Sequence, residues 1–237
     1  VLNIGSFRTW SRNVSSHNMS NGSFTFQEVP SSGWKYKHHM YFLTQKLELL
    51  DVPGEWFFDH ESPSNTVYYM PRDGRDPNDL NIRMKTQPYA ILCSDDDGVV
   101  VEGFDYFATT FRLDDCDGSE IRNSTLLYPS TSKRSLGYAG EDMDNRHVSR
   151  VDDCIGCLVD RCDFLYTDGA AFEAHGGASS SQNNTINNSY FYHIDWSGSD
   201  QKSLMTTIMM DGTTNRFTNN TMHKTGTSAT IRIGNAP

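Results

Sequence analysis

Apolar and polar positions follow one recurring pattern through the C-terminal part of the chain. Five segments begin with an apolar residue and have a second apolar residue at the sixth position: residues 101–106, 121–126, 159–164, 186–191 and 217–222. Their third positions are Gly103, Asn123, Arg161, Asn188 and Asn219. Glycine and asparagine best tolerate the left-handed backbone that a sharp corner between two strands requires. The pattern therefore predicts two short strands joined by a tight corner in each segment.

The spacing of these segments indicates a right-handed parallel β-helix. They begin 20, 38, 27 and 31 residues apart. A solenoid accommodates this variation because loops leave its corners while the strands stay stacked about 4.8 Å apart. The parallel crossovers are expected to be right-handed.

A further strand of each coil shows strict period-two alternation. Such strands are expected at residues 109–113, 171–176, 207–212 and 230–234. Alternation places Glu173, Met209 and Arg232 in one row on the outward face of this second sheet.

Residues 1–92 lack the repeat and contain aromatic strands separated by turn signals. Residues 55–59 and 66–70 flank one such turn and predict a β-hairpin. We therefore expect an all-β chain in which residues 1–92 form a β-rich flank that covers the first coil. Residues 93–237 form the coils of the solenoid.

Two pieces of the flank carry a family resemblance. Residues 47–59 (LELLDVPGEWFFD) and 66–71 (TVYYMP) resemble the segment that precedes the coils in many right-handed parallel β-helix proteins of the pectin-lyase-like superfamily. The resemblance spans roughly residues 40–237. It implies an association with extracellular carbohydrate, since the superfamily includes polysaccharide lyases, glycoside hydrolases, epimerases and non-catalytic surface proteins.

The composition limits the cellular compartment and the binding partners that can be expected. The 237 residues carry 20 Lys and Arg against 30 Asp and Glu, a net charge of −10, which argues against nucleic acid and anionic membranes as partners. No apolar stretch approaches the roughly 18 residues that a membrane span needs. Seven Asn-x-Ser/Thr sites favour a secreted, extracellular glycoprotein.

The glycosylation sites differ in their expected surroundings. We expect glycans at Asn13, Asn18, Asn21, Asn183 and Asn187, most strongly at the first three, which lie in a loop, and less at Asn123 and Asn219, which occupy corners of the repeat. Asn13, Asn18 and Asn21 lie in a Ser-, Asn- and Gly-rich segment without a strand pattern.

The five cysteines fit an oxidising compartment, although an odd number leaves at least one thiol unpaired or paired outside this chain. Cys116 and Cys154 each stand five residues before a repeat segment. They are expected to stack about 5 Å apart on neighbouring coils, within the range of a disulfide. Cys162 takes an inward or corner position in the repeat and is expected to be a buried free thiol or packing residue.

The outward face of the second sheet is the candidate catalytic site, with Glu173, His175, Asp211 and Arg232. Glu173 and Asp211 are one coil apart and offset by two residues, which strand geometry converts to about 8 Å. Inverting glycosidases hold their two carboxyl groups about 6.5–9.5 Å apart. The alternative is a solvated charged surface without chemistry.

A resemblance to polygalacturonases is weaker evidence for catalysis than this carboxylate spacing. Asp152 and Asp153 resemble the acidic pair of those enzymes, and residues 167–169 resemble another piece of their pattern. The pieces stand in the wrong order, and the later signatures are absent. We therefore do not transfer their catalytic roles.

Clustered carboxylates make calcium a candidate cofactor. Ca²⁺ takes six to eight oxygen ligands, often from closely spaced aspartates. The candidate ligands are Asp114, Asp115, Asp117 and Glu120, and acidic runs also occur at residues 95–97 and 142–144. Solvated turn residues are the alternative, since no run has an EF-hand spacing.

Taken alone, the sequence favours a secreted structural, adhesive or glycan-binding module. The regular strand at residues 230–234 is followed by no cap, which predicts either further chain or end-to-end stacking with another copy or partner. The alternative is a carbohydrate-active enzyme, a polysaccharide lyase or a glycoside hydrolase, that uses the face with Glu173 and Asp211. A polysaccharide or other glycan is then the expected ligand.

Overall fold

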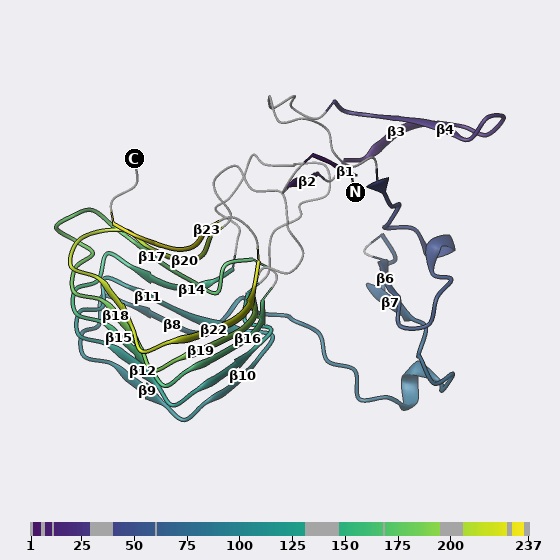
Figure 1. The fold of residues 1–237 in the computed structure, drawn as a ribbon. Helices are drawn as coiled ribbons and strands as arrows, with labels where there is room; N and C mark the ends of the chain where they lie inside the picture. Colours follow the sequence, from purple (N-terminus) through teal and green to yellow (C-terminus); the bar gives the residue numbers. More distant parts are fainter. Residues whose placement is uncertain are drawn as a thin grey trace.

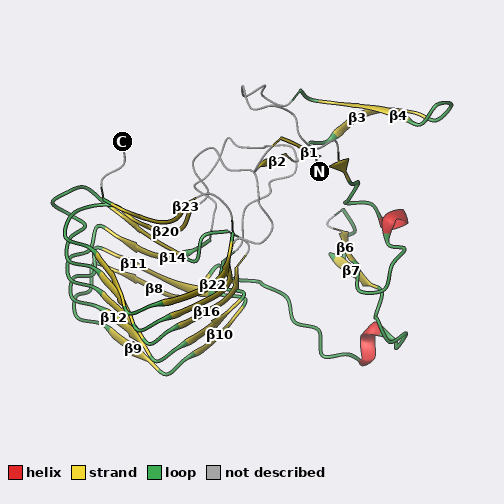
Figure 2. Cartoon of the chain, in the orientation of Figure 1, coloured by secondary structure: helices red, strands yellow, loops and turns green. Residues whose placement is uncertain are grey.

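The computed structural model describes residues 2–5, 8–10, 12–28, 40–59, 61–130, 147–167, 169–194, 206–226 and 229–234. From Tyr89 onward these residues form a parallel β-solenoid (Figure 1). Three parallel sheets of six, five and five strands run along its axis (Figure 2). No α-helix occurs in the described part of the chain.

Each coil contributes one strand to each sheet. The first coil holds β8 (Tyr89–Ser94), β9 (Val100–Glu102) and β10 (Asp105–Phe107), and the second holds β11 (Thr110–Asp114), β12 (Glu120–Arg122) and β13 (Thr125–Leu127). The third has β14 (Ser149–Asp152), β15 (Leu158–Asp160) and β16 (Asp163–Thr167), and the fourth has β17 (Phe172–His175), β18 (Thr185–Asn187) and β19 (Tyr190–Ile194). The fifth has β20 (Thr206–Met210), β21 (Arg216–Thr218) and β22 (Thr221–Thr225), and β23 (Ala229–Ile233) follows.

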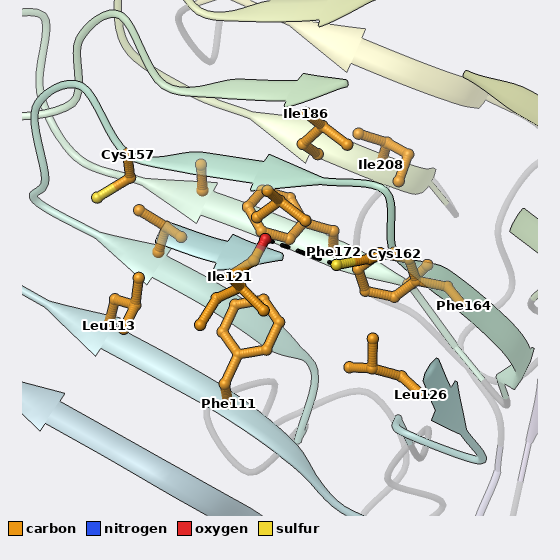
Figure 3. Packing of buried hydrophobic residues seen from close by; sticks show 14 of the residues in the cluster. Phe111, Leu113, Ile121, Leu126, Cys157, Cys162, Phe164, Phe172, Ile186 and Ile208 are labelled. Atoms are coloured by element: carbon orange, nitrogen blue, oxygen red, sulfur yellow. Dashed lines mark hydrogen bonds between the residues drawn. The ribbon is translucent and has the colours of Figure 1, made fainter. Parts of the chain in front are cut away.

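The five repeat segments stack in register, as the sequence predicts. Their first apolar positions form one inward row and their sixth positions another. Phe164 and Phe191 of the second row stack with ring centroids 4.8 Å apart and planes 7° from parallel. These side chains fill the interior of the solenoid together with those of the six-stranded sheet (Figure 3).

The corner position of the repeat has the left-handed backbone expected of it. φ is 77° at Gly103, 48° at Asn123 and 51° at Asn188, and Arg161 adopts the same conformation. The residue after this corner supports the stack through its side chain. The backbone N–H of Cys162 donates to Ser189 Oγ on the next coil at 3.1 Å, and the Ser189 N–H donates to Asn220 Oδ1 at 2.8 Å.

A matching ladder of hydrogen bonds runs inside the solenoid at the corner that precedes the strands of the β9 sheet. The N–H of Val99 donates to Ser119 Oγ, that of Cys157 to Asn184 Oδ1 and that of Asn184 to Asn215 Oδ1, at 2.8–3.0 Å. Buried backbone groups need such partners. Small polar residues therefore recur at these two inward positions, where they fix the register of successive coils.

The N-terminal flank is antiparallel. β1 (Leu2–Gly5) pairs with β2 (Arg8–Trp10) and β5 (Met40–Tyr41), while β3 (Val14–Asn18) pairs with β4 (Ser23–Phe26). β6 (Trp56–Asp59) and β7 (Thr66–Tyr69) form the predicted hairpin. Single 3-10 turns stand at Leu47–Leu49 and Pro77–Asp79.

Two details of the predicted organisation differ from the structure. β8 begins at Tyr89, inside the segment assigned to the flank, because Phe111 and Leu113 of β11 pair with Ile91 and Cys93. The flank strands lie beside the coils and not over the first coil (Figure 1).

Two of the three expected glycosylation sites of the flank, Asn18 and Asn21, lie on a hairpin and not in a strandless loop. Asn18 ends β3, Asn21 lies in the β3–β4 turn, and both are exposed, as is Asn13. Asn183 is also exposed, whereas Asn187 is half-buried and its side chain bonds to Asp160 and Thr218. Glycosylation itself stays a prediction. Among the described residues, no helix has the length and apolar character needed to cross a bilayer.

Candidate functional site

The outward face of the six-stranded sheet carries two parallel rows of charged side chains. In-register pairing aligns Arg112, Arg150, Glu173, Met209 and Arg232 in the first row. Two residues further along each strand, Asp114, Asp152 and His175 form the second row, and Asp211 continues it because its N–H donates to Ala174 O. Strand alternation sends all of these side chains to the same face.

The four residues predicted to share a site are brought together. His175 Nε2 lies 2.8 Å from Glu173 Oε2, and His175 Nδ1 lies 3.6 Å from Asp211 Oδ2. Arg232 Nη2 stands 3.6 Å from Asp211 Oδ1. We call these four side chains the Glu173 cluster. It spans three coils, and its imidazole lies between two carboxylates.

Burial within the Glu173 cluster is uneven. The Glu173 side chain is 3% exposed, whereas those of Asp211 and His175 are 17% and 29% exposed. Glu173 points away from the solenoid interior, yet it is shielded from water. Changing Glu173 is therefore expected to lower the stability of the fold, because a buried carboxylate depends on its partner for solvation.

Two facing atoms of the Glu173 cluster are buried without a hydrogen bond. Asp211 Oδ1 and Arg232 Nη2 have no such partner within the described residues, although their charges attract across 3.6 Å. Buried polar groups are almost always paired in folded proteins. The two charges therefore compensate each other across a separation slightly longer than a hydrogen bond.

The sequence reasoning missed Arg112 and Arg150 and did not place Asp114 and Asp152 beside the Glu173 cluster. Asp152 is 6% exposed and lies between Arg112 Nε at 3.0 Å and Arg150 Nη2 at 3.1 Å. Arg112 Nη2 also bonds to Asp114 Oδ2 at 2.8 Å. The same alternation that places Glu173 outward places these residues outward one and two coils earlier, so extending the register backward would have found them.

Tyr89 adds a phenol to this region. Burial raises the pKa of Tyr89, while the positive charges of Arg150 and Arg112 act in the opposite direction. The ring packs edge-on against His147 at 5.8 Å. A neutral hydroxyl therefore stands near the arginines and can donate a hydrogen bond to an anionic or polar ligand.

The predicted calcium ligands do not converge. Asp114 pairs with Arg112, Asp117 Oδ1 accepts the Ile155 N–H at 2.7 Å, and Glu120 pairs with Arg122. Among the described residues, no group of three His, Cys, Asp or Glu side chains could hold a metal ion. Asp115 is the exposed left-handed residue of its turn. The carboxylates of Asp114, Asp115, Asp117 and Glu120 thus do not form one group, and residues 142–144 lie outside the described ranges.

The cysteines stack as expected but are not bonded as expected. The N–H of Cys116 donates to Cys154 Sγ at 3.1 Å, which confirms that the two residues are neighbours on successive coils. All five cysteines lie in the described residues and are buried free thiols, so the Cys116–Cys154 disulfide is not present. The Cys154 sulfur takes the acceptor place that serine or asparagine takes elsewhere in the corner ladders. The Cys116 sulfur turns instead toward Cys93.

Comparison with known proteins does not assign the chain to a family. No family model matches the chain, and no curated protein or solved structure matches it. The fold and the arrangement of side chains therefore carry the functional argument.

Proposed function

We propose that the chain is an extracellular right-handed β-helix protein of the pectin-lyase-like kind and that it cleaves a polysaccharide on the outward face of the six-stranded sheet. One observation carries the proposal. Side chains from three successive coils meet as a carboxylate–imidazole–carboxylate–guanidinium chain, with 2.8 Å between Glu173 Oε2 and His175 Nε2.

The Glu173 cluster has the groups that glycosidic bond cleavage needs. Hydrolysis uses two carboxyl groups as acid and as base or nucleophile, and elimination uses a base beside a cation that neutralises an acidic sugar. Asp211 is the more accessible carboxylate, so we assign it direct contact with substrate. Glu173 and His175 hold and exchange protons behind it, and Arg232 attracts a uronate carboxylate or a polar hydroxyl.

A row of aromatic side chains supports a sugar ligand. Phe107, Tyr128, Tyr166, Tyr192 and His223 follow one another along the coils, and we call them the aromatic row. Neighbouring ring centroids are 5.3–6.0 Å apart. Phe107, Tyr128 and Tyr166 are exposed, and Lys224 Nζ lies 3.2 Å from Tyr192 Oη. Rings with polar edges suit the alternating apolar faces and hydroxyl groups of a glycan chain.

An activity screen tests the proposal. Purified protein is incubated with acidic and neutral polysaccharides, and both unsaturated products and new reducing ends are measured. Unsaturated products indicate a lyase, and reducing ends without unsaturation indicate a hydrolase. A panel that covers uronate-containing and neutral glycans and yields neither product would contradict the proposal.

The aromatic row gives a binding prediction. Tyr166→Ala removes a ring that contacts Tyr128, Tyr192 and His193, and we expect it to weaken polysaccharide binding about 5–10-fold, the equivalent of roughly one aromatic contact. Affinity electrophoresis in gels that contain the glycan measures the change. Phe104→Ala removes an exposed ring outside the row and should leave mobility unchanged. If the glycan retards both variants and the parent equally, the aromatic row does not bind the polysaccharide.

A structural or adhesive role is the second candidate. Ile231 and Ile233 of β23 continue the inward row of Ile208 and Met210, yet they are 42% and 47% exposed. β23 is an edge strand of its sheet, so a second copy stacked on it would cover both side chains. We expect concentration-dependent association in sedimentation velocity that Ile231→Lys abolishes. A monomer at all concentrations would exclude this assembly.

A further inference from the structure

We propose that Cys93 and Cys116 form a disulfide that ties the first coil of the solenoid to the second. Their Sγ atoms lie 2.9 Å apart. Cys93 is the penultimate residue of β8, and Cys116 follows the end of β11 by two residues. A disulfide has an S–S bond of about 2.05 Å, so less than about 1 Å of sulfur movement completes it.

The other thiols are not directed at the Cys93 sulfur, and the side chains of Cys154 and Cys157 hydrogen-bond to each other. Cys154 donates to Asp152 O at 3.0 Å while accepting the Cys116 N–H. Cys157 donates to Cys116 O at 3.0 Å. Cys162 donates to Ile121 O at 3.6 Å across the interior (Figure 3). Cys116 therefore has one sulfur neighbour in bonding direction, which is Cys93.

The bond forms by exchange with a small or protein-borne disulfide as the oxidant. One thiolate attacks the oxidant's disulfide and releases one of its halves as a thiol, and the second cysteine then displaces the other half. Two cysteine thiols become one disulfide, two electrons reduce the oxidant, and the two protons appear on its released thiols. The exchange therefore balances without any group from the Glu173 cluster, and it is independent of the proposed activity.

Burial sets when the exchange can happen. It raises the pKa of Cys93 to about 12, with the nearby Cys116 thiol acting in the same direction. The attacking species is the thiolate, which is scarce at neutral pH under these conditions. Cys116 is fully buried. We therefore expect the bond to form while the chain folds and to resist reduction afterwards.

The first coil is where such a bond stabilises most. Its strands β8, β9 and β10 are the edge strands of their three sheets, so each has a neighbour on one side. Leu92 and Val100 of this coil are 66% and 51% exposed. A disulfide to the second coil limits the opening of this edge and removes conformational freedom from the unfolded chain.

Peptide mapping distinguishes the possible pairings. The full chain is refolded with oxidised and reduced glutathione, free thiols are alkylated at low pH, and trypsin is added without reductant. Trypsin places Cys93 in residues 86–112, Cys116 in residues 113–122 and both Cys154 and Cys157 in residues 151–161. The proposal expects residues 86–112 joined to residues 113–122. Full alkylation of all five cysteines, or residues 113–122 joined to residues 151–161, would overturn it.

Variants supply a second readout. Cys93→Ser should leave Cys116 open to alkylation after denaturation and lower the Tm by about 6–12 °C. Reductant present during refolding should lower the parent's Tm by the same amount and leave that of Cys93→Ser unchanged. Cys162→Ser is the control, because it removes a buried thiol without breaking the pair. A Tm of Cys93→Ser that falls further with reductant would place the stabilising bond elsewhere and contradict the assignment.

Discussion

Asp211→Asn is expected to lower turnover of the polysaccharide identified by the screen by about 100- to 10,000-fold, the range of a lost acid or base. Asparagine keeps the shape of the side chain but can neither accept a proton nor hold a negative charge. Asp211 is the accessible carboxylate of the Glu173 cluster, and its Oδ1 is buried without a hydrogen bond in the described part of the chain. Initial rates at saturating substrate measure the loss.

Glu173→Gln should lower turnover to a similar extent but should also destabilise the fold. The Glu173 side chain is almost fully buried against His175, and replacing a charged hydrogen-bond partner there costs about 1.5–3 kcal/mol. Differential scanning calorimetry separates this loss from the catalytic one.

Asp105→Asn provides the matched control, since Asp105 is exposed on β10 in another sheet. Full activity in both Asp211→Asn and Glu173→Gln would place the chemistry outside the Glu173 cluster. A loss of activity in Asp105→Asn as large as in Asp211→Asn would show that the assay reports surface charge and not catalysis.

Much of the solenoid could be predicted because its repeat is local. An apolar residue, a corner residue and a second apolar residue within six positions specify two strands and the left-handed turn between them. Parallel stacking then copies that unit without needing distant information. Gly103, Asn123 and Asn188 have positive φ in the structure, as their residue types predicted. Arg161 adopts the same backbone against its intrinsic preference, because the stacked coils on both sides determine its conformation.

Assembly of the Glu173 cluster was predictable for the same reason. Strands that stack in register bring equivalent positions of successive coils together, so alternation alone places Glu173, His175 and Asp211 on one face. Alternation does not predict what surrounds that face. It could not show that Glu173 is buried, because alternation gives the direction of a side chain and not how closely its neighbours surround it.

The structure differs from the sequence-based predictions where the contacts depend on the direction of a side chain. Cys116 and Cys154 stack as predicted, yet the Cys154 sulfur faces the Cys116 N–H and the Cys116 sulfur faces Cys93. The carboxylates around Asp114 do not converge because arginines and backbone N–H groups already engage them. Strand spacing sets where residues lie, but rotamers and local donors set what their atoms contact.

Gly212→Ala is expected to be the most disruptive small change in the solenoid. Gly212 has φ of 106°, and an added Cβ would lie 1.9 Å from Ser181 O on the preceding coil. That carbonyl accepts the Thr213 N–H, while Ser181 Oγ donates to Asp211 O, so relieving the clash breaks contacts between the fourth and fifth coils. Backbone strain and lost hydrogen bonds together cost at least about 3 kcal/mol.

The measurement is the Tm, with activity as a second readout. A loss of at least about 3 kcal/mol should lower the Tm by roughly 6–12 °C or more for a domain of this size. Gly156→Ala is the matched control, because Gly156 also has positive φ but has open space around its Cβ position. Its expected cost is about 1 kcal/mol of backbone strain. Since Asp211 directly precedes Gly212, Gly212→Ala should also displace that carboxylate and lower turnover, while Gly156→Ala should not. Equal Tm losses in the two variants would mean that the fifth coil is not packed against the fourth as closely as Ser181 and Gly212 require.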